Sequence, residues 1–339
     1  MEHRRLVPMQ PTHSTDPARP ADSPGPADSS RPAGPSAPTE SAAEQATERA
    51  ARTAEAQTRS VRNARAAALP AKLSRSWLLV NAAMPETFEA AQASDADSVI
   101  FDLEAPVPED GKDAAREHVV RALECGMSAW VRVNGTTTDH WERDLDAVKS
   151  LPGLRGIMLP NTEHPEQVTY TSMRAGAGVP VIALIETARG IENATRVAEA
   201  PGTFRLALGT NDFRKDTGVA DDPVALAYAR SRLVVATRVG GLPGAIDGPS
   251  PAGAPTERVI EDCGWTMTMG MAGKLVLDTA QIGILNTELS PSEDDRRWAR
   301  DMLDQAEDGG KITDGSYLPR LARAKKIARL ADSYGLWNA

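Results

Sequence analysis

Cysteine is almost absent from this 339-residue chain, which contains only Cys125 and Cys263. The two cysteines lie far apart in the sequence and neither is part of a CxxC pair. A thiolate metal site and a disulfide framework are therefore excluded as the basis of the fold. We expect two reduced thiols, as is usual in a cytoplasmic protein.

Long apolar runs are absent as well. No run approaches the roughly 18 residues that a membrane-spanning helix needs. The charged residues at the start of the chain are not followed by the apolar core of a secretory signal. We therefore expect no membrane partner and a cytoplasmic location.

The chain has no surplus of positive charge, because its formal net charge is −9. Nucleic-acid binding depends on clustered Lys and Arg, so we expect no nucleic-acid partner. No GxGxxG motif follows the first apolar run and no GxxxxGK[ST] motif occurs anywhere, which disfavours dinucleotide and P-loop nucleotide binding. The five histidines, His140 among them, fall in tail, helix or loop positions and are expected at the surface.

The first 72 residues contain few large apolar side chains. Residues 1–39 are rich in Pro, Ala, Ser and Asp, and residues 40–68 are rich in Ala, Glu, Gln and Arg. Such a composition cannot bury enough surface to offset the entropy of ordering. We predict a disordered, low-complexity tail over 1–72, a folded domain over 73–288 and a C-terminal helical extension over 289–339.

The remainder of the chain alternates short apolar runs with helix-like stretches. Eight runs rich in apolar and β-branched residues occur at 76–82, 98–104, 129–135, 155–161, 179–187, 204–212, 243–249 and 273–279. Such runs are typical of strands buried on both faces of a parallel sheet, and the stretches between them indicate βαβ units. Eight units are what a (β/α)8 TIM barrel needs, and this α/β barrel is the predicted fold class. Periodicity alone leaves a doubly wound sheet open.

Polar residues gather at the carboxyl end of these runs. They are Asp102, Glu104, Arg132, Asn134, Asn161, Glu186, Asn211, Asp212, Asp247 and Asp278. In a TIM barrel all the strand ends of this kind meet around one mouth, where the active sites of the fold lie. The sequence therefore predicts an active site built from these side chains.

Glu186 and Asp212 form the most informative pair. They follow two consecutive runs, which in a barrel are neighbours about 4.8 Å apart. Two carboxylates that close repel one another unless a cation or a proton lies between them. Mg²⁺ takes one or two carboxylates together with water and substrate oxygens, so we predict a Mg²⁺ site with Glu186 and Asp212 as ligands. A pair of solvated loop acids is the alternative.

Arg132 lies inside an apolar run, where an unpaired charge is costly. It is predicted to bind a substrate carboxylate or carbonyl and to stabilise developing negative charge. A structural ion pair with Asp102 or Glu104 is the alternative, and both roles are compatible. We take Arg132, Asp102 and Glu104 as candidate catalytic residues.

Three further residues are candidates for binding the substrate. Besides Arg132, these are Asn134, Asn161 and Asp247. Asp247 lies in a tight Gly-Pro turn, so it is equally well interpreted as a residue that orients the backbone. The expected ligand is a small acyl-CoA or a 2-oxo or hydroxy acid.

These motifs together resemble a known family. The segments RSWLLVNA, VIFDLE, VRVNG, GIMLPN, ALIETARG, LGTNDFRKDTG, YARSRLVVA and AIDGP are similar in order and spacing to the citrate lyase beta-subunit-like family of the HpcH/HpaI aldolase superfamily. Malyl-CoA and citramalyl-CoA lyases are relatives within it. The resemblance covers about residues 74–330. It implies a TIM barrel, Mg²⁺ held by Glu186 and Asp212, a substrate-binding Arg132, an acidic Glu104 near the metal, and a homotrimer or hexamer.

The chain departs from the family pattern at several places. The first strand has Asn81-Ala82 where the family usually has Pro-Gly, and Asn161 replaces a lysine. The IHPxQ motif becomes LDTAQ at 277–281. The C-terminal aspartate expected from the resemblance is missing from the stretch GSYLP at 315–319, although Asp314 lies beside it.

Three functions remain open on this basis. The first is a Mg²⁺-dependent carbon–carbon lyase that cleaves or forms a 3-hydroxyacyl-CoA of the citryl, malyl or citramalyl type. The second is a CoA-independent 2-oxo acid aldolase or biosynthetic enzyme on the same barrel, which the altered first strand and Asn161 favour. The third is a non-catalytic binding or scaffold barrel.

Overall fold

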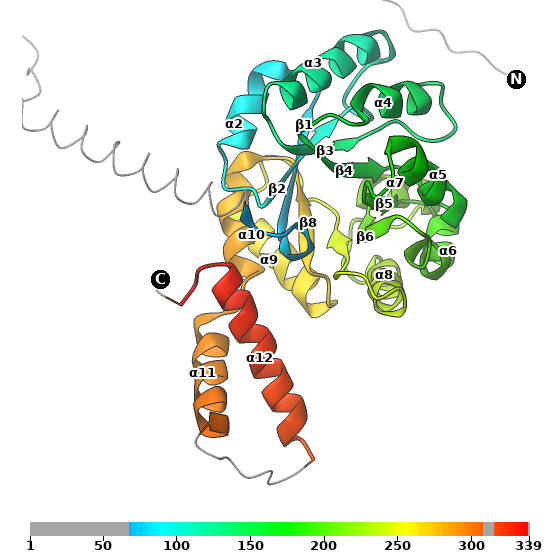
Figure 1. Ribbon diagram of the computed structural model, residues 1–339. Helices are drawn as coiled ribbons and strands as arrows, with labels where there is room; N and C mark the ends of the chain where they lie inside the picture. Colours follow the sequence, from blue (N-terminus) through cyan, green and yellow to red (C-terminus); the bar gives the residue numbers. More distant parts are fainter. Residues whose placement is uncertain (1–67, 308–314, 338–339) are drawn as a thin grey trace, which may run out of the picture. The chain divides into compact units, whose positions relative to one another are not determined.

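Eight parallel strands close into a barrel in the order of the sequence, which confirms the predicted fold class. The computed structural model describes residues 68–307 and 315–337. The strands are β1 (Ser76–Asn81), β2 (Ser98–Asp102), β3 (Ala129–Arg132), β4 (Leu154–Leu159), β5 (Val181–Ile185), β6 (Thr203–Leu208), β7 (Ile246–Asp247) and β8 (Gly273–Val276). Figure 1 shows the helices arranged around these strands.

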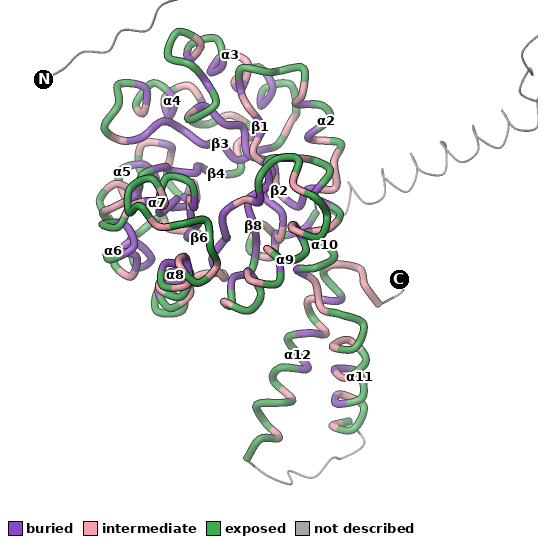
Figure 2. The backbone as a smooth tube through the Cα atoms, turned by 180° about the vertical axis from the view of Figure 1, so that it is seen from behind, coloured by how far each residue is buried: buried purple, intermediate pink, exposed green. Residues whose placement is uncertain are grey.

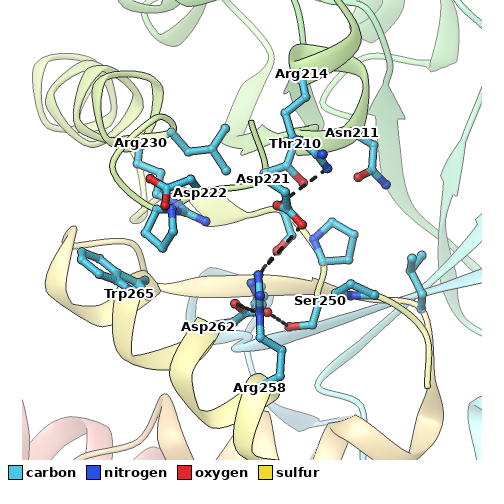
Figure 3. A pocket seen from close by; sticks show the side chains of 17 residues that line it. Thr210, Asn211, Arg214, Asp221, Asp222, Arg230, Ser250, Arg258, Asp262 and Trp265 are labelled. Carbon is cyan, nitrogen blue, oxygen red and sulfur yellow. Dashed lines mark hydrogen bonds and ion pairs between the residues drawn. The ribbon is translucent and has the colours of Figure 1, made fainter. Parts of the chain in front are cut away.

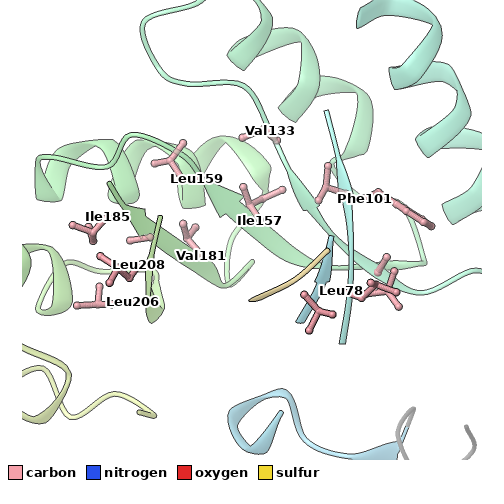
Figure 4. Packing of buried hydrophobic residues seen from close by; sticks show 14 of the residues in the cluster. Leu78, Phe101, Val133, Ile157, Leu159, Val181, Ile185, Leu206 and Leu208 are labelled. Atoms are coloured by element: carbon pink, nitrogen blue, oxygen red, sulfur yellow. The ribbon is translucent and has the colours of Figure 1, made fainter. Parts of the chain in front are cut away.

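Alternation along each strand divides the core into two clusters, because successive side chains point to opposite faces. One cluster fills the barrel and consists of Trp77, Ile100, Trp130, Met158, Ile182, Leu184, Ala207, Ile246 and Leu275. The neighbouring residues point outward and pack under the helices, as Leu78, Phe101, Ile157 and Leu206 do in Figure 4. Both clusters are fully or nearly fully buried, and Figure 2 shows the strands as the buried part of the fold. This alternation decides which polar side chains reach the barrel interior.

One glycine makes room for the barrel filling. A methyl group on Gly156 of β4 would lie 2.3 Å from the Trp130 ring. Trp130 in turn stacks on Phe204 with 5.3 Å between ring centroids, and its ring meets Trp77 edge to face at 5.4 Å. The large aromatic side chains therefore close the amino end of the barrel.

Helices follow the strands as predicted, with differences at their boundaries. The main ones are α2 (Phe88–Gln92), α3 (Lys112–Glu124), α4 (His140–Val148), α5 (Pro165–Ala175), α6 (Ala188–Ala198), α7 (Thr210–Thr217), α8 (Ala227–Val239), α9 (Thr256–Thr268) and α10 (Ile282–Glu288). The predicted strand over 204–212 is too long, because β6 ends at Leu208 and α7 begins at Thr210. Asn211 and Asp212 therefore lie in the first turn of a helix.

The start of the folded domain precedes the predicted boundary at residue 73. Leu69 is buried, and a short 3-10 helix covers Ala71–Leu73. The prediction of a disordered tail over 1–72 otherwise falls on residues 1–67, which lie outside the described part of the chain.

The C-terminal extension consists of two helices, α11 (Glu293–Glu307) and α12 (Tyr317–Ser333). They share a small core of Ala299, Met302, Ala324 and Ile327. Residues 308–314 between them are outside the described part. In residues 68–307 and 315–337 no helix is long and apolar enough to cross a membrane.

Tyr334 ties the end of α12 to the beginning of the barrel. Its hydroxyl donates a hydrogen bond of 2.8 Å to the carbonyl oxygen of Leu73. The Arg75 guanidinium lies 3.9 Å from the centroid of its ring, and Arg75 is fixed by two hydrogen bonds to Asp97. Residues at opposite ends of the folded unit are thereby joined.

Replacing Tyr334 with alanine is expected to lower the free energy of unfolding by about 2 kcal/mol, from the lost cation–π contact and hydrogen bond. Tyr334→Phe keeps the ring and should lose only about 1 kcal/mol. Urea unfolding of the three proteins measures the difference. Equal stability of wild type and Tyr334→Ala would show that this contact does not hold α12 in place.

Candidate functional site

The mouth of the barrel receives the polar residues that continue the inward-facing series. Asp102 is two residues beyond Ile100, Arg132 two beyond Trp130, and Glu186 two beyond Leu184. Asp102 and Arg132 are also paired in register between β2 and β3. Strand alternation thus places these three side chains on the inner face of the barrel at its carboxyl end.

Arg132 is held by two carboxylates. Its Nε and Nη2 both donate to Asp102, with Nε at 2.7 Å from Oδ1, and its Nη1 lies 3.2 Å from Glu104 Oε2. The residue is 9% exposed. Burial alone would lower the pKa of Arg132, but Asp102 and Glu104 raise it above its ordinary value, so the guanidinium is permanently charged. The predicted structural ion pair is therefore present, and it orients Arg132.

Glu186 lies between the end of β5 and the start of α6, where Thr187 caps the helix by accepting from the Gly190 N–H. It is 3% exposed, and its Oε1 accepts a 2.7 Å hydrogen bond from the Asn161 N–H. Burial is the main cause that raises the pKa of Glu186 to about 7, and the nearby carboxylates of Asp212 and Glu104 raise it further. The Asn161 N–H and the Arg132 guanidinium lower the pKa and oppose this shift only in part. A buried carboxylate in this state is stabilised by a cation.

Gly209 allows the neighbouring strand to approach Glu186. A methyl group at Gly209 would lie 2.3 Å from Glu186 Oε2. The Gly209 N–H donates to the Ile185 carbonyl, and Asp216 on α7 accepts from the Ala188 N–H at 2.7 Å. The Gly209 contact fixes the start of α7 against the end of β5, and the Asp216 contact fixes the last turn of α7 against the start of α6. Asp212 lies between these two contacts, in electrostatic range of Glu186.

The mouth has an excess of negative charge. Four carboxylates, those of Asp102, Glu104, Glu186 and Asp212, face one cation, Arg132, so this group carries a formal charge of −3 (four negative and one positive). Within the described residues no group of three or more His, Cys, Asp or Glu is arranged to hold a metal. Mg²⁺ needs only one or two carboxylates when substrate and water supply the other oxygens, so the oxygen donors of Glu186 and Asp212 fit this ion.

Asp247 is outside the mouth. Ile246 points into the barrel, so Asp247 points outward, where it is fully buried. It accepts from Arg230 Nε at 3.0 Å, from Thr266 Oγ1 and from the Gly248 N–H. These contacts agree with the alternative role of Asp247 in orienting the backbone, and its role in substrate binding stays a prediction.

The two predicted asparagines also have structural contacts. Asn134 is 4% exposed, and its amide N–H groups donate to the Asp144 carboxylate and the Leu103 carbonyl. The physical reason is that the loop after β3 turns this side chain back against α4. The side chain of Asn161 is exposed at the mouth, and its backbone has a φ of 48°. The N–H of Asn161 donates a hydrogen bond to the Glu186 carboxylate.

A supporting layer beneath the mouth was missed by sequence reasoning. The Lys112 ammonium donates to the carbonyls of Leu103 at 2.8 Å and Glu104 at 2.6 Å. Arg116 pairs with Asp144 at 2.9 Å and contacts His140, which is 8% exposed. His140 is therefore not the surface residue that was predicted. Only the spacing of Lys112 and Arg116 on one helix face gave a signal for this layer.

Lys112→Met is expected to reduce turnover about tenfold, because two carbonyls of the loop that carries Glu104 lose a charged hydrogen-bond donor. Lys149→Met, on the exposed end of α4, should leave turnover unchanged and serves as the control. Steady-state kinetics on both variants decide this. If Lys112→Met is fully active, the loop does not depend on its ammonium.

The positions that depart from the family pattern differ in exposure: Asn161 is exposed, Asn81 and Asp278 are half-buried, and Ala82 is buried. Asp278 lies in the loop after β8 and accepts from the N–H groups of Ala280 and Gly253. The 315–319 stretch begins α12, and Asp314 is outside the described residues.

Comparison with known proteins agrees with this geometry. The model of the family "HpcH/HpaI aldolase/citrate lyase" matches residues 75–279, and that of the "HpcH/HpaI aldolase C-terminal domain" matches 294–335. A citrate lyase subunit beta-like protein of Deinococcus radiodurans is 28% identical over 281 residues, 76% of this chain and 97% of that protein. A (3S)-malyl-CoA thioesterase of Cereibacter sphaeroides is 31% identical over 224 residues, 64% of this chain and 78% of the relative.

Among solved structures, CitE from Mycobacterium tuberculosis in complex with magnesium, acetoacetate and coenzyme A is similar with a TM-score of 0.64. It is 29% identical, and the match covers 77% of this chain and 99% of that one. The same protein in complex with magnesium and pyruvate matches with a TM-score of 0.61 and 26% identity over 77% of this chain and 100% of the other.

Proposed function

Because the chain belongs to the HpcH/HpaI aldolase/citrate lyase family and is an enzyme of the carbon–carbon lyase class, we propose that it cleaves or forms a 3-hydroxyacyl-CoA in a Mg²⁺-dependent reaction. The observation that carries this proposal is the buried Glu186 carboxylate, with its pKa raised to about 7 beside Asp212. Structural relatives were solved with magnesium, and one of them with coenzyme A.

Glu186 and Asp212 are the proposed ligands of Mg²⁺. A magnesium ion at this place stabilises negative charge on a substrate carbonyl oxygen. Glu186 is kept in position by the Asn161 N–H, and Gly209 leaves the space that its carboxylate occupies. The protein thus holds the Glu186 oxygen donor in a fixed position, with Asp212 in electrostatic range of it.

Arg132 is proposed to bind and orient the substrate. Asp102 takes two of its N–H donors, so the guanidinium cannot swing out of the mouth. Glu104 is only 3.2 Å from Nη1 and its side chain is 24% exposed, so a substrate carboxylate or carbonyl can compete for that nitrogen. A fixed cation of this kind lowers the energy of a transition state in which an oxygen becomes negative.

The proposal includes that the acyl group of the substrate is carried by CoA. The altered residues Asn81, Asn161 and Asp278 favour a second candidate, a CoA-independent 2-oxo acid aldolase on the same site. A non-catalytic scaffold barrel does not need the four carboxylates and the arginine of the mouth. A cytoplasmic location and a homotrimeric or hexameric assembly are part of the same proposal.

A turnover assay with mass-spectrometric detection tests the substrate class. The purified protein is offered malyl-, citramalyl- and citryl-CoA beside the corresponding free acids, each with Mg²⁺. We expect a shorter acyl-CoA and a 2-oxo acid as products, and product masses separate this cleavage from thioester hydrolysis. Cleavage of free acids alone would establish the CoA-independent aldolase. No reaction with any of them would contradict both.

A further inference from the structure

A polar pocket lies beside the barrel, and Figure 3 shows the side chains that line it. Its walls come from the loops after β7 and β8, from α9 and from the segment that joins α7 to α8. The cavity has a volume of about 120 Å³, whereas about 15 Å³ is enough for one water molecule. A polyatomic group therefore fits. We call this the β7 pocket.

At the floor of the β7 pocket two buried cations share one buried carboxylate, while Asp221, Asp222 and Asp262 line its other walls. Arg230 and Lys274 both line it, and both are paired with the single buried carboxylate of Asp247, at 3.0 and 3.8 Å. The Arg230 side chain is 8% exposed. Its Nη1 has no hydrogen-bond partner among the described residues.

This arrangement is costly without a ligand. The ion pairs with Lys274 and Arg230 hold the pKa of Asp247 below its usual range against the effect of burial, so this carboxylate is ionised. One negative charge then faces two buried cations. A buried charge without a full set of partners destabilises a fold, and an anion in the pocket would supply the missing partner.

Two more arginines stand at the rim. Arg214 of α7 and Arg258 of α9 approach Asp221 from two sides, at 3.7 and 3.9 Å. These distances allow attraction but exceed those of a hydrogen bond. Arg214 Nε also lacks a partner in the described part of the chain. Asp221 therefore holds the two arginines only weakly. Arg258 is also paired through Nε with Asp262 at 2.8 Å, which leaves its Nη groups to an oxyanion.

From this geometry we propose that the β7 pocket binds an oxyanion, a phosphate or a carboxylate group. Arg230 and Lys274 supply the charge of the floor, and Arg214 and Arg258 supply donors at the rim. Loops after strands seven and eight form phosphate sites in many TIM barrels, which is consistent with this location. Arginine is the side chain best suited to such groups, because its planar fork matches their geometry.

The pocket is physically connected to the mouth. Thr210 and Asn211 line it and immediately precede Asp212 in the first turn of α7. An oxyanion bound here fixes the turn that carries Asp212. We infer that the bound oxyanion is the distal charged group of the substrate. This inference rests on the proposed function, whereas the binding of an oxyanion in the β7 pocket does not depend on it.

Calorimetric titration of the metal-free full chain with inorganic phosphate and with malonate tests this proposal. We expect saturable binding of at least one, weakened tenfold or more in Arg258→Gln and in Arg214→Gln. Arg297→Gln is the matched control, because Arg297 also pairs with an acid four residues away in its helix. The ion pair is 2.9 Å long between Arg297 and Glu293 and 2.8 Å long between Arg258 and Asp262. Arg230→Lys, which keeps the buried charge but not the fork, should weaken binding as well.

Competition identifies the source of the oxyanion. If coenzyme A displaces bound phosphate, the pocket binds a phosphate group of the thioester carrier. If malonate binds and coenzyme A does not compete with it, the pocket binds a distal carboxylate of the substrate. Asp212→Asn should bind the probes as the wild type does, so the pocket is tested even if the proposed lyase reaction fails. Absence of binding of both probes, or equal binding by wild type, Arg214→Gln and Arg258→Gln, would overturn the proposal.

Discussion

Glu186→Gln is expected to lower kcat about 1,000-fold, the size of effect seen when a group that stabilises transition-state charge is removed. Glutamine keeps the shape of the side chain and can still accept the Asn161 N–H. It removes the negative charge that we propose holds Mg²⁺. Activity is measured at saturating substrate and Mg²⁺, with Glu117→Gln on the exposed face of α3 as the control. If the activity of Glu186→Gln stays within tenfold of that of the wild type, Glu186 is not a ligand of Mg²⁺.

The same variant should change the pH dependence of stability in metal-free protein. The pKa of Glu186 is about 7 in the folded chain and 4.5 ordinarily, so the folded state holds this proton more tightly. The free energy of unfolding therefore falls as pH rises from 4.5 to 7, by up to about 3 kcal/mol at 1.36 kcal/mol per pKa unit. Glu186→Gln removes that decline. Parallel pH profiles of melting temperature for the two proteins, recorded in EDTA, would contradict the assignment.

Arg132→Lys is expected to lower kcat about 100-fold or more, although the charge is conserved. A lysine is a point charge and cannot donate to Asp102 through two nitrogens while a third faces the substrate. The substrate would lose an oriented donor that acts where negative charge develops. Steady-state kinetics should show the loss in kcat and in kcat/KM.

A matched substitution at the other end of the barrel separates chemistry from stability. Arg205 is fully buried and donates to the carbonyls of Ser74 and Gly244 at the amino ends of the strands. Arg205→Lys should lower the melting temperature and leave the activity of the folded protein unchanged. If both lysine variants lose activity only in proportion to the folded fraction, Arg132 has no role beyond its ion pair.

Strand alternation explains how far the sequence could predict the mouth. Buried parallel strands are recognisable as apolar runs, and the polar residues that follow them mark the carboxyl end of a barrel. Asp102, Arg132 and Glu186 all continue an inward-facing series. Asp247 follows the inward Ile246 by one residue and so faces α8. Counting alternation within the short β7 run would have separated it from the others.

Loop conformation and paired contacts could not be predicted in this way. Asn134 turns toward Asp144 because of the path of the loop after β3, and Asp212 belongs to a helix that begins within the predicted sixth strand. The layer of Lys112, Arg116 and His140 depends on contacts between helices, which a single sequence does not reveal. Local apolar patterns determine strands, whereas these positions are set by tertiary packing.

The proposed metal site is tested by the turnover of 3-hydroxyacyl thioesters by wild type and by Asp212→Ala. Turnover is measured across a range of Mg²⁺ concentrations and in EDTA. We expect cleavage by the wild type that rises with Mg²⁺ and stops in EDTA. We also expect a folded Asp212→Ala protein with neither turnover nor Mg²⁺ binding. An Asp212→Ala variant that remains active without metal would contradict the assignment of Glu186 and Asp212 as the centre of the reaction.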